Sequence, residues 1–291
     1  MKKIPITFCY NFSLYEEARR RQILHEFAVN GAKHMVLTDR MVKQIMAEPE
    51  WADILNREMA AEGLTFVDSH APFGAKHDLY NLYPEDFDAL ILRHKLHLNI
   101  AALMNVDTIA MHIGNDNICP EIPKPELFDR TCRVIDALLP EAEKCGVVIG
   151  IENAWTPSNT ADVMLKIKKE FPSDYLGFCY DSGHANIMEN GKLHSENNAD
   201  IYWHSAGVDQ VQWDDQLPEK LQSDIVNCHL HDNRGDGDEH RLPGIGIVNW
   251  QRVVNILKNA PRLRSIQSEV SIFYASVSVK ELVNKFNSLF C

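Results

Sequence analysis

The chain contains 291 residues, of which 45% are hydrophobic, so it is long enough to bury a large core. Its 29 basic and 41 acidic residues give a net charge of −12, which provides no electrostatic footprint for the phosphate backbone of nucleic acid, and we expect no nucleic-acid partner. No apolar run reaches membrane-spanning length and none of signal-peptide length precedes Asn11, so we expect a cytoplasmic protein with no membrane partner.

Short β-rich runs alternate with longer amphipathic segments along the whole chain. In chain order, the predicted strands cover residues 4–10, 33–38, 64–70, 106–113, 147–153, 175–181, 225–230 and 264–270. Between them, apolar residues three and four apart predict helices, as at Leu90, Ile91 and Leu98. Eight strands that are each followed by a helix predict a single (β/α)₈ TIM-barrel domain over residues 1–291, with a parallel eight-stranded barrel and outer helices.

The main alternative fold is an open, doubly wound sheet with one small extra domain. A dinucleotide-binding sheet of that kind needs a Gly-x-Gly-x-x-Gly turn after its first strand. The nearest candidate, Gly244-Ile245-Gly246, comes far too late in the chain. The pattern therefore favours the barrel.

Ligand-type side chains follow the last six predicted strands, where a barrel enzyme carries its catalytic groups. The candidates, with two residues of the loop after the seventh strand, are His70, His112, Glu152, Asp181, His184, His229, Asp238, His240 and Glu269. Singly, such residues are more often structural. Six consecutive strand ends indicate a cation, because burying this many unpaired carboxylates and imidazoles together would be costly. Nitrogen and carboxylate ligands without thiolate suit Zn, Mn, Fe or Co, and Mg where carboxylates dominate.

The remaining histidines are assigned lesser roles. His77, in the loop after the third strand, is placed where it could touch substrate, and His231 is intermediate between a ligand and a structural residue. The others fall away from strand ends and are expected to be solvated or packed: His25, His34, His94, His97, His194 and His204.

Five segments, each after the expected strand, carry a resemblance to a known family. They are His70-Ala71-Pro72-Phe73, His112-Ile113-Gly114, Ile151-Glu152-Asn153, Asp181-Ser182-Gly183-His184 and the run from Asp238 to Gly246. In this order they resemble the xylose-isomerase-like TIM-barrel superfamily, which contains sugar isomerases, sugar epimerases, related dehydratases and endonuclease IV. The resemblance covers nearly the whole chain and implies a metal-dependent enzyme.

The resemblance implies two alternative ligand sets. The mononuclear epimerase site maps onto Glu152, Asp181, His229 and Glu269, with His184 near the substrate. The trinuclear endonuclease IV site maps onto the same residues plus His70, His112, His184, Asp238 and His240. The ligand residues alone therefore do not separate the two activities. One divalent metal (Mn, Zn, Mg, Co or Fe) is favoured, and two or three remain open.

The surroundings of the ligands favour a small sugar-like substrate. The net charge opposes DNA binding, and His112 is followed by Ile113-Gly114 where endonuclease IV has Pro-Gly. Trp155 lies close after Glu152, and its aromatic face either stacks on a sugar ring or packs a helix onto the barrel.

We therefore expect an isomerase or epimerase that transfers a proton next to the carbonyl of a small sugar or polyhydroxylated carbonyl compound. Glu152 and Glu269 are the predicted acid/base pair, and Trp155 is a predicted substrate contact. Resemblance to the epimerases implies that His184 and Arg234 hold substrate oxygens, although the spacing of Arg234 from His229 is about one residue off the epimerase pattern. The alternative is an endonuclease IV-like metal-dependent phosphodiesterase or phosphatase. A homo-oligomer is left open.

Overall fold

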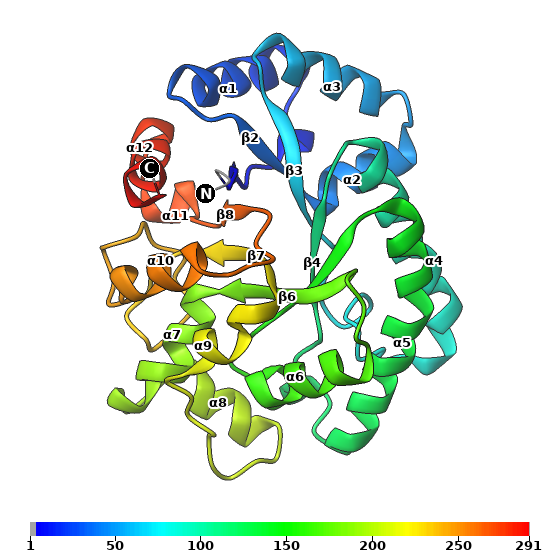
Figure 1. Ribbon diagram of the computed structural model, residues 1–291, viewed down its shortest axis with the longest axis vertical. Helices are drawn as coiled ribbons and strands as arrows, with labels where there is room; N and C mark the ends of the chain where they lie inside the picture. The colour runs from blue at the N-terminus through cyan, green and yellow to red at the C-terminus, as the bar shows by residue number, and fades with distance from the viewer. Residues whose placement is uncertain (1–3, 291) are drawn as a thin grey trace.

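Eight parallel strands pair in chain order, and β8 pairs back with β1, so the sheet closes on itself (Figure 1). The structure, a computed structural model, describes residues 4–290. The strands are β1 (Ile6–Phe8), β2 (His34–Leu37), β3 (Thr65–His70), β4 (Thr108–His112), β5 (Val148–Glu152), β6 (Leu176–Asp181), β7 (Ile225–Leu230) and β8 (Ile266–Ser268). Each lies within one predicted run, and the predicted (β/α)₈ barrel is confirmed.

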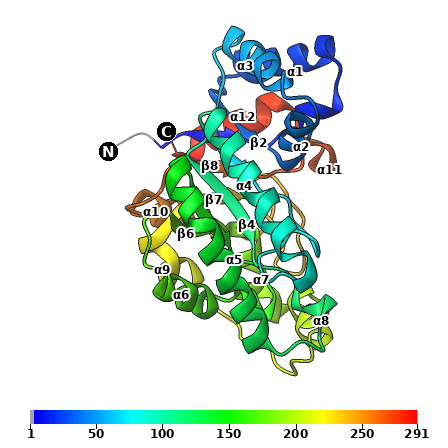
Figure 2. The ribbon, with the colours of Figure 1, turned by 90° about the vertical axis from the view of Figure 1, so that its right-hand side faces the viewer.

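Helices connect the strands and surround the barrel (Figures 1 and 2). They are α1 (Glu17–Val29), α2 (Asp39–Ala47), α3 (Trp51–Ala61), α4 (Phe87–Leu103), α5 (Lys124–Cys145), α6 (Ala161–Glu170), α7 (Ser182–Asn190), α8 (Asn198–Ser205), α9 (Leu217–Leu221), α10 (Trp250–Lys258), α11 (Ile272–Ala275) and α12 (Val279–Phe290). Side-chain caps fix several starts: Thr38 accepts from the backbone N–H of Met41 at α2. Among residues 4–290, no helix combines the length and the apolar character needed to cross a membrane.

Hydrophobic side chains fill the layer between strands and helices. β5, β6 and β7 are buried along their whole length, as expected of parallel strands that are covered on both faces. Ile109, Ile149 and Phe178 belong to one continuous cluster with the inward faces of the helices. This packed layer holds the strand ends in place, so the side chains that follow them have fixed positions.

The interior of the barrel has a polar floor. The buried carboxylate of Asp68 accepts hydrogen bonds from Thr108 Oγ1 at 2.8 Å, Ser265 Oγ at 3.0 Å and Asn227 Nδ2 at 3.1 Å. Side chains alternate along a strand, so His70 and His229, two positions after Asp68 and Asn227, point to the same side of the sheet as those residues. Both histidines lie nearer to the carboxyl ends of their strands. The floor therefore supports the residues that follow it.

Candidate metal centre

The candidate ligands gather where strands β3 to β8 end. His70, His112, Glu152 and Asp181 are the last residues of β3 to β6, His229 is the penultimate residue of β7, and Glu269 follows β8 directly. The strand register places His112 beside Glu152 and Asp181 beside His229. All the strands are parallel, so these ends meet at one rim of the barrel.

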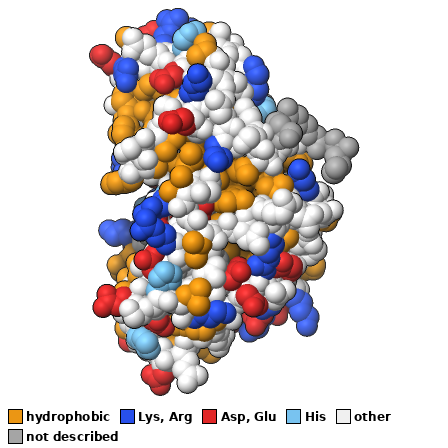
Figure 3. Space-filling model, turned by 90° about the vertical axis from the view of Figure 1, so that its left-hand side faces the viewer, with side chains coloured by type: hydrophobic (Ala, Val, Ile, Leu, Met, Phe, Trp, Pro, Cys, Tyr) orange, Lys and Arg blue, Asp and Glu red, His pale blue; other side chains and the backbone are white. Residues whose placement is uncertain are grey.

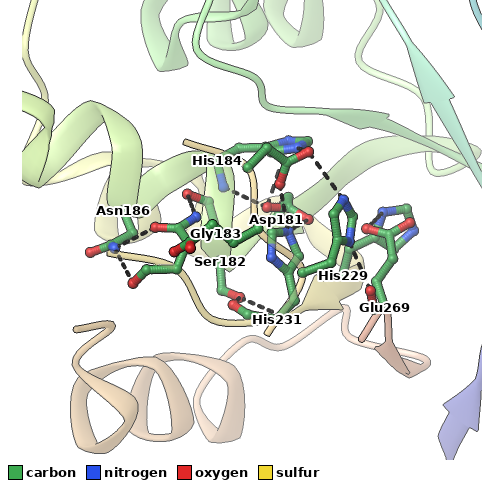
Figure 4. Close-up of polar contacts among 12 residues, drawn as sticks. Asp181, Ser182, Gly183, His184, Asn186, His229, His231 and Glu269 are labelled. Carbon is green, nitrogen blue, oxygen red and sulfur yellow. Dashed lines mark hydrogen bonds and ion pairs between the residues drawn. The ribbon is translucent and has the colours of Figure 1, made fainter. Parts of the chain in front are cut away.

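Four residues form the innermost group, which Figure 4 shows in part. One potential ligand atom from each of Glu152, Asp181, His229 and Glu269 lies within 4.8 Å of the other three. Nδ1 of His229 lies 3.1 Å from Oε1 of Glu152 and 3.5 Å from Oε2 of Glu269. The imidazole of His229 is completely buried. These are the four residues that the family resemblance implies for a mononuclear site.

A second group shares Asp181 with the first. Ligand atoms of Asp181, His184 and His231 also lie within 4.8 Å of one another. Nε2 of the buried His231 lies 3.2 Å from Oδ2 of Asp181 and 3.5 Å from Oδ1 of Asp238, and its ring stacks on that of His240 with centroids 4.1 Å apart. The sequence leaves His231 unassigned, yet it stands two residues after His229. That spacing is the signal that could have placed both on one side of the chain.

Two histidines and an aromatic ring lie on the other side of Glu152. Nε2 of His112 lies 3.2 Å from Oε2 of Glu152, and Nε2 of His70 lies 3.8 Å from the same oxygen. The ring of Phe73 packs against both imidazoles, with centroids 5.3 Å from His70 and 5.0 Å from His112. More than half of Phe73 is exposed, so it presents an aromatic edge to the mouth of the barrel that sequence reasoning did not single out.

Three of the histidines are held by backbone carbonyl groups. Nδ1 contacts a carbonyl oxygen at 2.7 Å in His70, at 2.8 Å in His184 and at 2.8 Å in His240. A carbonyl oxygen can only accept, so Nδ1 donates and Nε2 of the neutral ring carries the lone pair. In His184 and His240, Nε2 faces the carboxylate of Asp238, which can only accept, so these two rings carry a proton on Nε2 as well. Metal-binding histidines are commonly held in this way.

Many buried polar atoms of the cluster have no hydrogen-bond partner among residues 4–290. They are Oε2 of Glu152, Oδ2 of Asp181, both ring nitrogens of His229 and of His231, and Oδ1 of Asp238. Leaving buried polar groups unpaired is costly, and the cost is greater for charged groups. Convergent oxygen and nitrogen atoms of this kind are ligands for a divalent metal ion, so the residues present fit such an ion.

The charged groups shift one another's pKa values. Burial opposes ionisation of Glu152, but the imidazoles of His229 and His112 outweigh burial and hold the pKa of Glu152 well below its usual range. Burial and the nearby carboxylate of Glu152 raise the pKa of Glu269. Burial favours neutral His229, yet the carboxylates of Glu152 and Glu269 raise its pKa to about 10. Protons on the imidazoles thus balance the carboxylates, a role that a bound cation takes over with release of protons.

The predicted substrate contacts lie at different distances from the cluster. Trp155 follows β5, and its ring meets that of His184 edge to face at 4.8 Å. Its carbonyl oxygen accepts a 2.8 Å hydrogen bond from Nε1 of Trp203, which is buried in a small separate core. Arg234 is exposed in the loop after β7, where its backbone N–H donates to Glu239. Its guanidinium makes no hydrogen bond or ion pair with the residues that the structure describes.

Sequence comparison connects the chain to a described family. A family model described as xylose isomerase-like TIM barrel matches residues 28–268. The chain is 27% identical over 168 residues to an uncharacterised protein of Methanocaldococcus jannaschii, a match that covers 55% of this chain and 50% of the relative. The chain thus spans about half the length of the curated relatives it matches.

Solved structures show the same architecture. A D-tagatose 3-epimerase-like protein has a TM-score of 0.69 at 19% identity, with 97% of both chains covered. The IOLI protein with a bound zinc atom has a TM-score of 0.70 at 15% identity, with 98% of this chain and 96% of the other covered. Sugar epimerase-like proteins are therefore among the structural neighbours, and some neighbours bind zinc. The family match over residues 28–268 and the closed eight-stranded barrel agree: the chain belongs to the xylose isomerase-like TIM-barrel family.

Proposed function

We propose that the protein is a divalent-metal-dependent isomerase or epimerase that acts on a small sugar or polyhydroxylated carbonyl compound by proton transfer next to the carbonyl. One observation carries the proposal. The carboxylates of Glu152 and Glu269 approach Nδ1 of His229 to 3.1 Å and 3.5 Å, within a cluster of converging ligand atoms at the mouth of the barrel. Two carboxylates so close to one point can reach one substrate carbon from different sides.

Glu152, Asp181, His229 and Glu269 would hold one metal ion, and the family likeness favours Mn, Zn, Mg, Co or Fe in that place. His231 and Asp238 extend the ligand set toward His184 and His240, so two or three ions also fit the proposal. When bound, the ion polarises the carbonyl of the substrate and the adjacent hydroxyl group.

The residues of the chain then move the proton. One glutamate carboxylate takes the proton from the carbon next to the carbonyl, and the electron pair of the broken C–H bond moves into the carbonyl to give an enediolate. Return of a proton to the opposite face inverts that carbon, and return to the former carbonyl carbon isomerises the sugar. His184 and Arg234 are proposed to hold substrate oxygens. Trp155 and Phe73 would cover the sugar ring from two sides.

Proton exchange with solvent tests this function. With D-fructose, D-tagatose or D-psicose in heavy water, the metal-loaded protein should introduce deuterium at the carbon next to the carbonyl, which a hydrolase would not do. Replacing Glu152→Gln or Glu269→Gln keeps the size of the side chain but removes its proton-accepting charge, so exchange should slow by roughly 10²–10⁴-fold. Glu143→Gln, on the exposed side of α5, is the matched control and should exchange at the native rate.

Loss of metal could imitate loss of the base, so each variant must retain its metal by elemental analysis. A metal-loaded Glu152→Gln, Glu269→Gln double variant that exchanges protons at the native rate would show that both assignments are wrong. NMR of the recovered sugar gives the rate and the position of the label together.

A second candidate, an endonuclease IV-like phosphodiesterase or phosphatase, has one observation in its favour. All nine histidine, aspartate and glutamate positions implied by that resemblance lie at the same mouth of the barrel. It ranks second because the net charge of −12 opposes binding to a phosphate backbone. Metal-dependent incision of duplex DNA at an abasic site, lost in Glu152→Gln, would reverse this order.

A further inference from the structure

A groove of about 800 Å³ lies beside the candidate metal centre. It shares two lining residues with the ligand cluster, Asp238 and His240. Figure 3 shows a hollow at the left edge of the molecule, with hydrophobic side chains above it and basic side chains below it. A volume of this size lies within the ~300–1,000 Å³ typical of sites for drug-sized ligands.

The groove has apolar as well as polar lining residues. Besides Asp238 and His240, it is lined by Leu242, Ile245 and Val277, and by Tyr274. Tyr274 is 91% exposed, so its aromatic face is available to a ligand. A ligand in the groove can therefore contact both ligand-type residues and apolar surface.

The charges of the groove argue against a phosphate group in it. Arg241 is the one lysine or arginine among the lining residues, and its Nε already donates to Glu239 at 2.7 Å. Asp238 and Glu281 add negative charge to the lining. An anionic substituent would be repelled here, whereas a neutral apolar one would lose water-exposed surface on binding.

The wall of the groove is joined to the candidate centre by backbone contacts. The N–H of Ser271, just before α11, donates to the carbonyl oxygen of His240 at 3.1 Å. The ring of His240 in turn donates from Nδ1 to the carbonyl oxygen of Glu269 at 2.8 Å. The start of α11, the short helix that carries Tyr274, is therefore joined to His240 and Glu269.

We propose that the substrate is amphipathic: a hydroxy-carbonyl head lies at the candidate centre, and an uncharged apolar or aromatic substituent lies along the groove against Tyr274 and Leu242. This inference rests on the proposed function and narrows it from sugars in general to glycosides or chain-extended ketoses without a phosphate group.

Two hydroxamates with the same chelating head test the inference by binding alone. Glycolohydroxamate resembles the enediolate formed next to a carbonyl, and its phenylethyl-substituted derivative adds an apolar tail to the same head. Titration calorimetry with the Mn²⁺-loaded full chain should show that the derivative binds about tenfold or more tightly than the parent, as expected when an aromatic ring is buried. Tyr274→Ala should remove most of this preference.

Phe273→Ala is the matched control on the same short helix. Phe273 is 73% exposed and its ring faces Tyr10, but it does not line the groove, so its removal should leave the preference unchanged. Equal binding of the two hydroxamates, or an undiminished preference in Tyr274→Ala, overturns the inference while the proton-exchange test stands by itself. If the metal-loaded protein binds neither compound, the proposed function fails and the inference fails with it.

Discussion

Gly183→Ala gives a demanding test of how tightly the candidate centre is packed. A Cβ added at Gly183 would overlap the ring of His231, lying 2.6 Å from Nε2 and closer still to Cε1. His231 has no room to withdraw, because it is fully buried beside Asp181 and Asp238 and stacks on His240. Gly183 also lies in the first turn of α7, where alanine would normally be favoured by about 1 kcal/mol.

The steric cost should exceed that helical gain. Overpacking a well-filled site costs about 1–3 kcal/mol, and His231 would also be displaced from the cluster, so both stability and metal content should fall. Urea unfolding followed by circular dichroism measures the first, and elemental analysis of dialysed protein measures the second.

Two further variants make the test specific. Gly237→Ala should change stability by less than about 0.5 kcal/mol, because its nearest neighbour outside the adjoining residues, Asn198, is 3.7 Å from the added atom. His231→Ala should partly rescue Gly183→Ala, since it removes the ring that the new methyl group strikes, and the double-mutant cycle should show a coupling of about 1 kcal/mol or more. A Gly183→Ala protein with native stability and native metal content would refute the reasoning.

Two other predictions concern the whole fold. Dialysis against a chelator should lower the melting temperature and Mn²⁺ or Zn²⁺ should restore it, since a ligand at ~100 times its dissociation constant adds about 2.7 kcal/mol; no shift with any divalent metal would sink the metal-site proposal. Burial lowers the pKa of His94 from the 6.5 of a free histidine to about 4, so the unfolded chain takes up this proton first. The stability contributed by neutral His94 is then present above pH 6.5 and is lost as the pH falls toward 4, by up to about 3 kcal/mol. Urea unfolding at several pH values should therefore show a shallower decline in His94→Gln than in the native chain, and identical slopes would contradict it.

The barrel could be predicted because its strands carry two signals at once. β5, β6 and β7 are continuous apolar runs, as buried parallel strands should be, and each leads to a polar residue at its carboxyl end. β1 and β8 are shorter than predicted, with three residues each. Sequence reasoning sees the apolar run but not the point where hydrogen bonding ends. A single domain over residues 1–291 and a homo-oligomer stay predictions.

The candidate ligands could be predicted to the extent that they end strands. Glu152 and Asp181 are terminal residues of β5 and β6, so their place at the rim follows from strand length alone. Asp238 and His240 come from the loop after β7, so strand length alone does not place them. His240 adopts a φ of 48°, in the left-handed region that residues other than glycine seldom occupy. No sequence pattern predicts that conformation for a histidine.

Sequence reasoning left the role of His231 undecided. Its position shows that knowing which residues can bind a metal does not tell where their side chains lie. The sequence places His231 two residues after His229, where it could be a ligand or a packed structural residue. What decides its surroundings is Gly183, which has no side chain and leaves room for the imidazole directly against α7. That contact joins a residue of α7 to His231, just after β7 and 48 positions further along the chain, so it depends on the closed barrel and not on any local pattern. Both nitrogens of His231 are buried without a hydrogen-bond partner among the described residues, and Asp181 lies 3.2 Å away. Because Gly183 has no side chain, the ring of His231 can lie against α7 and face the carboxylate of Asp181. Gly183 and His231 therefore act together in shaping the candidate centre.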